Sequence, residues 1–115
     1  MAKLLGADNK TVLLSDLKLA DQYFARLKGL LGTRSLGEDQ GLWISRCNSI
    51  HTFFMNYAID CVFLDSKFQV QSIVENVRPG RVVWPQRGAK SVEEMPANRA
   101  RALNIKEGDQ LHVGN

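Results

Sequence analysis

The stretch S-I-H-T-F-F-M-N-Y-A-I-D-C-V-F-L-D, residues Ser49 to Asp65, decides the fold. Its second half, Ile59 to Leu64, is apolar at every position except Asp60. A strand that is apolar on both faces is buried on both sides, which is typical of the centre of a sheet or of a barrel wall. The sequence therefore predicts a central strand here, preceded by a turn that contains most of the polar residues.

The regions on either side of this strand are also rich in strand signals. Asp65-Ser66-Lys67 has the composition of a hairpin turn. The run Phe68 to Val77 alternates after it, so an antiparallel hairpin with Ile59 to Leu64 is predicted. Further strands are predicted at Thr11 to Leu14 (with Leu17 to Leu19 as a continuation or as the other arm of a bulge), Gly41 to Ser45, Val82 to Trp84, Lys90 to Met95 and Gln110 to Val113.

Two short segments are predicted to be helical. Apolar residues recur at three-to-four spacing after Asp21, whose side chain suits an N-cap, and Gly32 provides a C-terminal stop. Pro96 suits the first position of a second helix that runs through Leu103. The predicted fold is one α+β, mainly β, domain over residues 1–115, built as a small antiparallel barrel-like sheet with two short helices packed on it.

The composition is that of a globular domain with a mild excess of positive charge. Hydrophobic residues make up 44% and charged residues 23% of the 115 residues, and the formal net charge is +3. These values exclude a disordered chain. The excess is concentrated between Arg78 and Lys106: against Glu93 and Glu94 this segment contains Arg78, Arg81, Arg87, Lys90, Arg99, Arg101 and Lys106. This region is either a solvated basic surface or a site for an anionic ligand or partner.

The cysteines and the first residues of the chain give an expectation for the cellular compartment of the protein. The spacing of Cys47 and Cys61 matches no zinc pattern, so we expect buried free thiols and neither a metal nor a cofactor. Residues 1–7 lack the apolar core of a signal peptide. No apolar run approaches the roughly 20 residues of a membrane-spanning helix. We therefore expect a cytoplasmic protein.

Three groups of motifs together resemble one family. They are Arg26-x-x-Gly29-Leu30-Leu31-x-x-Arg34; Gly41-Leu42-Trp43-Ile44 with His51-Thr52-Phe53-x-Met55 and Ile59-Asp60-x-x-Phe63-Leu64-Asp65; and Gly108-Asp109 before an apolar strand. The chain resembles, from about residue 12 to residue 113, the prokaryotic family called domain of unknown function 192. The resemblance implies a compact, mainly β, barrel-like domain with one or two helices. It implies no reaction, because the family has no established activity.

One position departs from the family pattern. Family members often have Glu-Leu-Pro-Ala-Gly before the last helix. This chain has Glu94-Met95-Pro96-Ala97-Asn98, so Asn98 stands where glycine is common.

The candidate site comes from polar residues within apolar surroundings, which is how pockets for small ligands are lined. His51 could act as a base, and Asp60 could orient it as in general-base catalysis. Alternatively, His51 only holds a turn in place. Arg26 and Arg34 have guanidinium groups that suit carboxylate or phosphate, or they form ion pairs between a helix and the sheet. The predicted ligand-binding residues are Arg26, Arg34, His51, Thr52, Met55 and Asp60.

Three functional hypotheses follow. The leading one is a non-enzymatic binding domain for a small anionic or polar ligand or a peptide. The second is a hydrolase-like or lyase-like enzyme that uses His51 as general base. The third is a structural or assembly domain that binds a protein through the basic region from Arg78 to Arg101. No paired surface aromatics of a nucleic-acid site are evident, so neither nucleic acid nor membrane is the expected partner.

Overall fold

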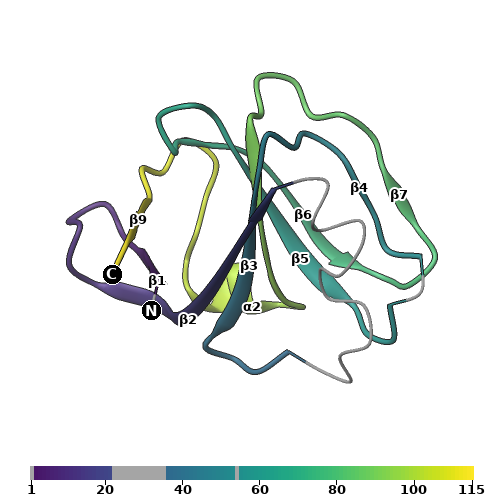
Figure 1. Cartoon of the computed structure of the whole chain (residues 1–115), viewed down its shortest axis with the longest axis horizontal. Coiled ribbons are helices and arrows are strands. Elements are labelled where there is room, and N and C mark those ends of the chain that lie inside the picture. Colours follow the sequence, from purple (N-terminus) through teal and green to yellow (C-terminus); the bar gives the residue numbers. More distant parts are fainter. Residues whose placement is uncertain (1, 22–35, 54) are drawn as a thin grey trace.

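The computed structural model describes residues 2–21, 36–53 and 55–115, and the described part is mainly β (Figure 1). One helix and nine strands are defined in it. They are β1 (Ala2–Leu5), β2 (Val12–Asp21), β3 (Gln40–Ser45), β4 (Ile50–His51), β5 (Ile59–Leu64), β6 (Val70–Val77), β7 (Val82–Val83), β8 (Ser91–Pro96), α2 (Arg99–Ala102) and β9 (His112–Gly114).

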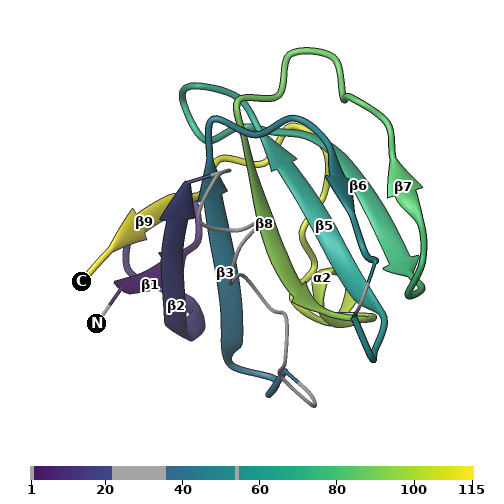
Figure 2. The ribbon, with the colours of Figure 1, turned by 45° about the vertical axis from the view of Figure 1, so that its right-hand side comes forward.

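Seven strands form one curled sheet in the order β6-β5-β8-β3-β2-β1-β9 (Figure 2). The segment that leads into β9 reaches the start of β6. There the N–H of Val70 donates to the carbonyl oxygen of Asp109 at 2.9 Å, and the N–H of Leu111 donates to that of Phe68 at 2.9 Å. The sheet is therefore a half-barrel whose first and last strands meet through the residues before β9.

Strand β5 is the centre that the sequence predicts. All six of its residues are buried, and it lies between β6 and β8. Val62 and Leu64 pack into one core cluster, and Cys61 and Phe63 pack into a second on the other face of the sheet. The predicted burial on both faces is confirmed.

The predicted hairpin between β5 and β6 is also confirmed. In its turn, Oδ1 of Asp65 accepts hydrogen bonds from the N–H groups of Lys67 (2.8 Å) and Gln69 (2.9 Å). Phe68 has a φ of 63°, outside the β region, so the strand begins at Val70 rather than at Phe68.

The N-terminal half differs from the prediction in two ways. Residues Ala2–Leu5 form β1, although Ala, Lys and Leu favour helix; pairing with β2 and β9 outweighs that preference. Strands β2 and β3 run parallel, so the sheet is not wholly antiparallel. Parallel neighbours need a long connection, and residues 22–39 provide it.

The prediction of two helices is only partly met. The first predicted helix lies outside the described residues, so the described part contains α2 alone. The second begins at Arg99 rather than at Pro96, which still belongs to β8 and pairs with Ile59. Asn98 has a φ of 71°, in the left-handed region, and this interrupts any helix from Pro96. In the described part of the chain no helix has the length and apolar character needed to cross a membrane.

The left-handed backbone at Asn98 also explains the departure from the family pattern. Glycine adopts a positive φ without a steric penalty, and asparagine is among the residues that tolerate it best. Asn98 therefore fills a position that requires this backbone conformation rather than a particular side chain.

Candidate functional site

Strands β4 and β7 form a separate two-stranded ribbon, in which Ile50 pairs with Val83 and His51 with Val82. The ribbon lies at the end of the molecule away from the two termini (Figure 1). Ile50 and Val83 face inward onto the core cluster that contains Phe63. The side chains that alternate with them face outward.

Thr52, a predicted ligand-binding residue, fastens this ribbon. It is completely buried. Its hydroxyl donates to the carbonyl oxygen of Arg78 at 2.6 Å and accepts from the N–H of Arg81 at 2.9 Å. Its own backbone binds the same turn, through the carbonyl oxygen of Arg81 and the N–H of Gly80. The polar atoms of Thr52 are therefore used to hold the turn at residues 78–81 against β4.

Asp60, a second predicted residue, has a comparable role in the main sheet. Its side chain is completely buried on β5. Oδ1 accepts from the N–H of Asn76 at 2.8 Å, and Oδ2 accepts from the N–H of Ala100 at 3.0 Å. The carboxylate thereby connects β5 to the end of β6 and to α2. Each oxygen satisfies a backbone donor that would otherwise lack a partner.

His51 and Met55 lie in different environments. His51 is exposed, and its ring stacks on that of Phe53 with centroids 4.9 Å apart and an angle of 26° between the planes. Met55 is half-buried and packs against the core cluster around Phe63. Among the described contacts none joins His51 to Asp60, so the proposed catalytic pair is not formed. Arg26 and Arg34 lie outside the described residues.

The outward face of the ribbon is a feature that the sequence analysis missed. Trp84 is 75% exposed, Val82 47% and Phe53 43%. Val82 on β7 pairs with the exposed His51 on β4, Phe53 stacks on His51 just after β4, and Trp84 directly follows β7. Large apolar side chains gathered at one exposed place mark interaction sites more often than isolated ones do.

The segments that contain this apolar surface have only positive charges. Residues 46–58 and 78–90, which contain the two ribbon strands, have no Asp or Glu. We call the exposed cations of these segments, together with the outward side of the ribbon, the basic face. Its charged members are Arg46, Arg78, Arg81, Arg87 and Lys90, all exposed.

The arginines of α2, by contrast, are compensated by acidic residues. Among the described residues, ion pairs join Arg99 to Asp39 (3.8 Å) and Arg101 to Glu75 (2.9 Å), and none involves the basic face. The basic region that the sequence suggests, from Arg78 to Arg101, therefore narrows to residues 78–90 together with Arg46. Reading residues 46–58 and 78–90 together would have shown the absence of acids, but nothing local connects the two segments.

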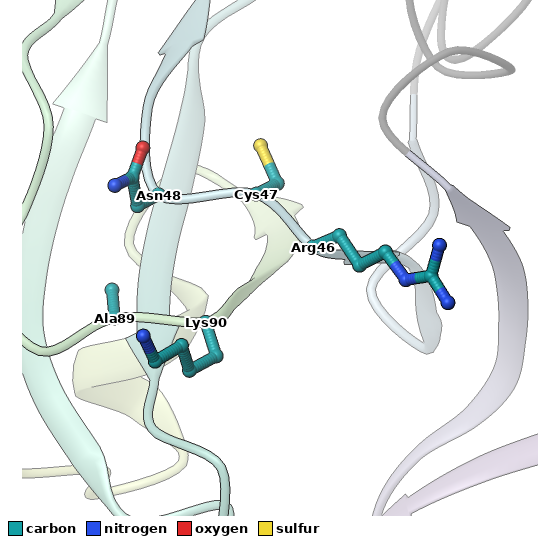
Figure 3. Close-up of a pocket in the computed structure, with 5 residues that line it drawn as sticks. All are labelled: Arg46, Cys47, Asn48, Ala89 and Lys90. Atoms are coloured by element: carbon teal, nitrogen blue, oxygen red, sulfur yellow. The ribbon is translucent and has the colours of Figure 1, made fainter.

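A pocket of about 350 Å³ lies beside the ribbon, where the connection from β3 to β4 crosses the connection from β7 to β8. The two connections are joined there by a hydrogen bond from the N–H of Cys47 to the carbonyl oxygen of Lys90, at 3.0 Å. The side chains of Arg46 and Lys90 extend in different directions from it (Figure 3). The pocket therefore has basic residues at its rim but no converging pair of cations.

Strand β8 has the opposite character, because it places two carboxyl groups in the core. Glu93 is completely buried between Trp43 on β3 and Val62 on β5. Burial, together with the neighbouring Glu94, raises the pKa of Glu93 well above its usual value. In the described part of the chain neither of its oxygens has a hydrogen-bond partner, and the same holds for Nε1 of Trp43. A protonated Glu93 fits this environment better than a carboxylate does.

Glu94 faces the other side of the sheet, next to Cys61 and Leu42. Burial raises the pKa of Glu94 to about 7. Burial, followed by the nearby carboxyl groups of Glu94 and Asp60, raises the pKa of the Cys61 thiol well above its usual value. A thiol with a raised pKa is a poor nucleophile, so Cys61 is a core residue rather than a catalytic one. The described residues include no group of three His, Cys, Asp or Glu side chains arranged to hold a metal ion.

Comparisons with known proteins show the same fold and the same family. A UPF0127 protein from Thermococcus sibiricus is 36% identical over 99 residues, which is 83% of this chain and 64% of the relative. A UPF0127 protein from Thermococcus gammatolerans is 33% identical over the same share of each chain. This chain therefore spans less than two thirds of the length of these relatives.

A solved structure of a protein of unknown function from Novosphingobium aromaticivorans superposes with a TM-score of 0.79 at 23% identity, covering 96% of this chain and 82% of the other. At that identity the likeness shows the fold alone. The family model described as "DUF192: Uncharacterized ACR" matches residues 5–113. The chain thus belongs to the DUF192 family, whose members are of uncharacterised function.

Proposed function

We propose that this domain is a non-catalytic binding module and that its basic face binds an anionic partner. One observation carries the proposal: all the charged residues in segments 46–58 and 78–90 are basic, and the same segments contain exposed apolar side chains. Like charges on one surface repel one another and destabilise the fold slightly, and an anionic partner relieves that repulsion.

The positions of the predicted site residues support binding over catalysis. A general base that uses His51 needs a group to orient its ring. The carboxylate that the sequence offers for this role, Asp60, has both oxygens bonded to backbone N–H groups. His51 instead stacks on Phe53 at the surface, where it can contribute to a contact.

The proposal is tested by reversing charge on the basic face. We expect the variant Arg78→Glu/Arg81→Glu/Arg87→Glu to lose binding to polyanions, measured by fluorescence anisotropy with labelled poly-L-glutamate and oligo-dT and by co-sedimentation with phosphatidylserine vesicles. The matched control is Lys10→Glu/Lys67→Glu/Lys106→Glu, which changes net charge equally at exposed positions elsewhere.

Binding by the native protein should weaken steeply as salt rises, because exposed charges are screened within about 8 Å at physiological ionic strength. The proposal fails if the native protein binds none of the three polyanions at low salt. It also fails if the control variant loses binding to the same extent as the basic-face variant.

The proposal includes a cytoplasmic location. Cys61 is a buried free thiol, the state in which cysteines are kept in a reducing compartment. Fractionation of cells that produce the protein at its natural level checks this, and recovery in an extracytoplasmic fraction would contradict it.

A further inference from the structure

We propose that the anionic partner is an acidic polypeptide segment with bulky apolar side chains, which docks on the outward side of the ribbon with Trp84 as its anchor. This inference rests on the proposed function of the basic face and names the chemistry of its partner. Carboxylates of the segment would pair with the arginines around the ribbon, and its apolar side chains would cover Trp84, Val82 and Phe53.

The outward side has the composition of a protein-binding hot spot. Trp and Arg are the residues most enriched where protein interfaces derive their affinity. Here a largely exposed Trp84 directly follows β7, between Arg81 and Arg87 in the sequence. The planar guanidinium group binds a carboxylate through two parallel hydrogen bonds, which the ammonium of lysine cannot do.

The backbone under this surface is held in place before any partner arrives. Thr52 fixes the turn that precedes β7, as described above. After β7, the N–H of Gln86 donates to the carbonyl oxygen of Asn48 at 2.8 Å. The side-chain amide of Gln86 donates to the carbonyl oxygen of Trp84 at 2.8 Å and accepts from the hydroxyl of Ser72 at 2.8 Å. A preorganised surface loses little conformational entropy on binding, so more of the contact energy appears as affinity.

The arrangement of the apolar side chains favours a polypeptide over single-stranded nucleic acid. Single-stranded nucleic acid binds on successive aromatic rings, each of which stacks on a base. On this ribbon the rings of His51 and Phe53 already stack on each other, and the aliphatic Val82 lies opposite His51. Aliphatic and aromatic groups in one patch suit the mixed apolar side chains of a peptide.

The same arrangement favours a polypeptide over a membrane. Interfacial binding buries apolar groups about 5–10 Å into the boundary between headgroups and acyl chains. The turn before β7 contains Arg78, Pro79 and Gly80, and the segment after it contains Pro85, Arg87 and Gly88. The exposed apolar side chains are thus interspersed with charged and turn residues rather than forming a continuous apolar tip.

The test compares two labelled peptides of equal charge. In one, Glu alternates with Leu and Trp; in the other, Glu alternates with Ser. We expect the native protein to bind the first peptide about tenfold more tightly, the effect of burying one good aromatic anchor. We expect Trp84→Ala and Phe53→Ala to abolish that preference. Leu19→Ala, which truncates an apolar side chain on β2 that is 52% exposed, should leave it unchanged.

The outcomes separate this inference from the proposed function. If the arginine variant loses binding while Trp84→Ala binds both peptides as the native protein does, the basic face is confirmed and the apolar anchor is rejected. Equal affinity of the native protein for the two peptides, or tighter binding to oligo-dT or phosphatidylserine vesicles, overturns the polypeptide assignment. Absence of all binding overturns both proposals. Since Trp84 is largely exposed, thermal unfolding of Trp84→Ala should match that of the native protein and so exclude misfolding.

Discussion

Apolar side chains are usually buried and acidic ones exposed, and strand β8 and the ribbon β4–β7 depart from this rule in opposite ways. β8 buries two carboxyl groups, Glu93 and Glu94, whereas acidic side chains are almost always exposed unless they are paired. The ribbon exposes Trp84 and Phe53, whose rings would normally be covered. The cause is position: β8 lies between the two core clusters, to which it contributes Met95 on one face and Val92 on the other, whereas Val82, Trp84 and Phe53 on the outward side of the ribbon are exposed.

The difference teaches where to look for function in this domain. The carboxyl groups of β8 are enclosed in the core, where Glu93 is completely buried and Glu94 is 5% exposed. The ribbon and the residues next to it expose Trp84 and Phe53 to solvent, in segments whose charged residues are all basic. Acidic residues with shifted pKa values are usual candidates for catalysis. In this domain they are buried, and the exposed apolar side chains of the ribbon are what a partner can reach.

The largest expected effect contrasts one truncation in each region. Phe63→Ala removes a completely buried ring from β5 and should lower the free energy of unfolding by about 3–5 kcal/mol. Trp84→Ala removes a larger ring from the ribbon and should change it by about 0.5 kcal/mol or less. Urea unfolding followed by circular dichroism measures both. Similar losses for the two variants would show that the ribbon face is covered in solution.

The next effect concerns pH and the buried acids of β8. Burial raises the pKa of Glu94 from 4.5 to about 7, so between these values the folded state binds more protons than the unfolded state does. Stability should therefore fall as pH rises from about 4.5 to about 7, by on the order of 2–3 kcal/mol for this residue. Unfolding of Glu94→Gln at several pH values should show a flatter profile. A native protein that becomes more stable over this range would contradict the assignment.

A smaller loss of stability is expected when the turn at residues 78–81 is detached from Thr52. Thr52→Val keeps the shape of the side chain but removes the hydroxyl that binds the turn at residues 78–81. The loss should be about 1–2 kcal/mol, because the N–H of Arg81 loses an acceptor. Binding of the Glu/Leu/Trp peptide should also weaken. Thr11→Val, at an exposed turn, is the control and should leave peptide binding unchanged.

The smallest expected effect tests the backbone before α2. Asn98→Ala should cost about 1 kcal/mol, because alanine is strained at a φ of 71°, whereas Asn98→Gly should be close to neutral. Thermal unfolding of the two variants provides the comparison. If alanine were tolerated as well as glycine, the left-handed conformation would not be the reason for the residue found here.

Several elements could be predicted from the sequence because their signals are local. The apolar run at residues 59–64 predicted that β5 is buried on both faces, and Asp65-Ser66-Lys67 predicted the turn to β6. The motifs also determined the family. The parallel pairing of β2 with β3, the strand β1 and the start of α2 depend on distant partners or on one backbone angle, so local patterns did not indicate them.

The candidate site shows the same limit more sharply. The sequence by itself determined that Thr52 and Asp60 are polar residues within an apolar segment. A buried polar side chain needs a partner, and sequence does not distinguish a ligand from a backbone N–H. Only the tertiary structure decided that the partners are Arg78, Arg81, Asn76 and Ala100. It also joined β4 and its neighbouring residues to β7 and its neighbouring residues, and so combined two stretches that contain basic and exposed aromatic side chains.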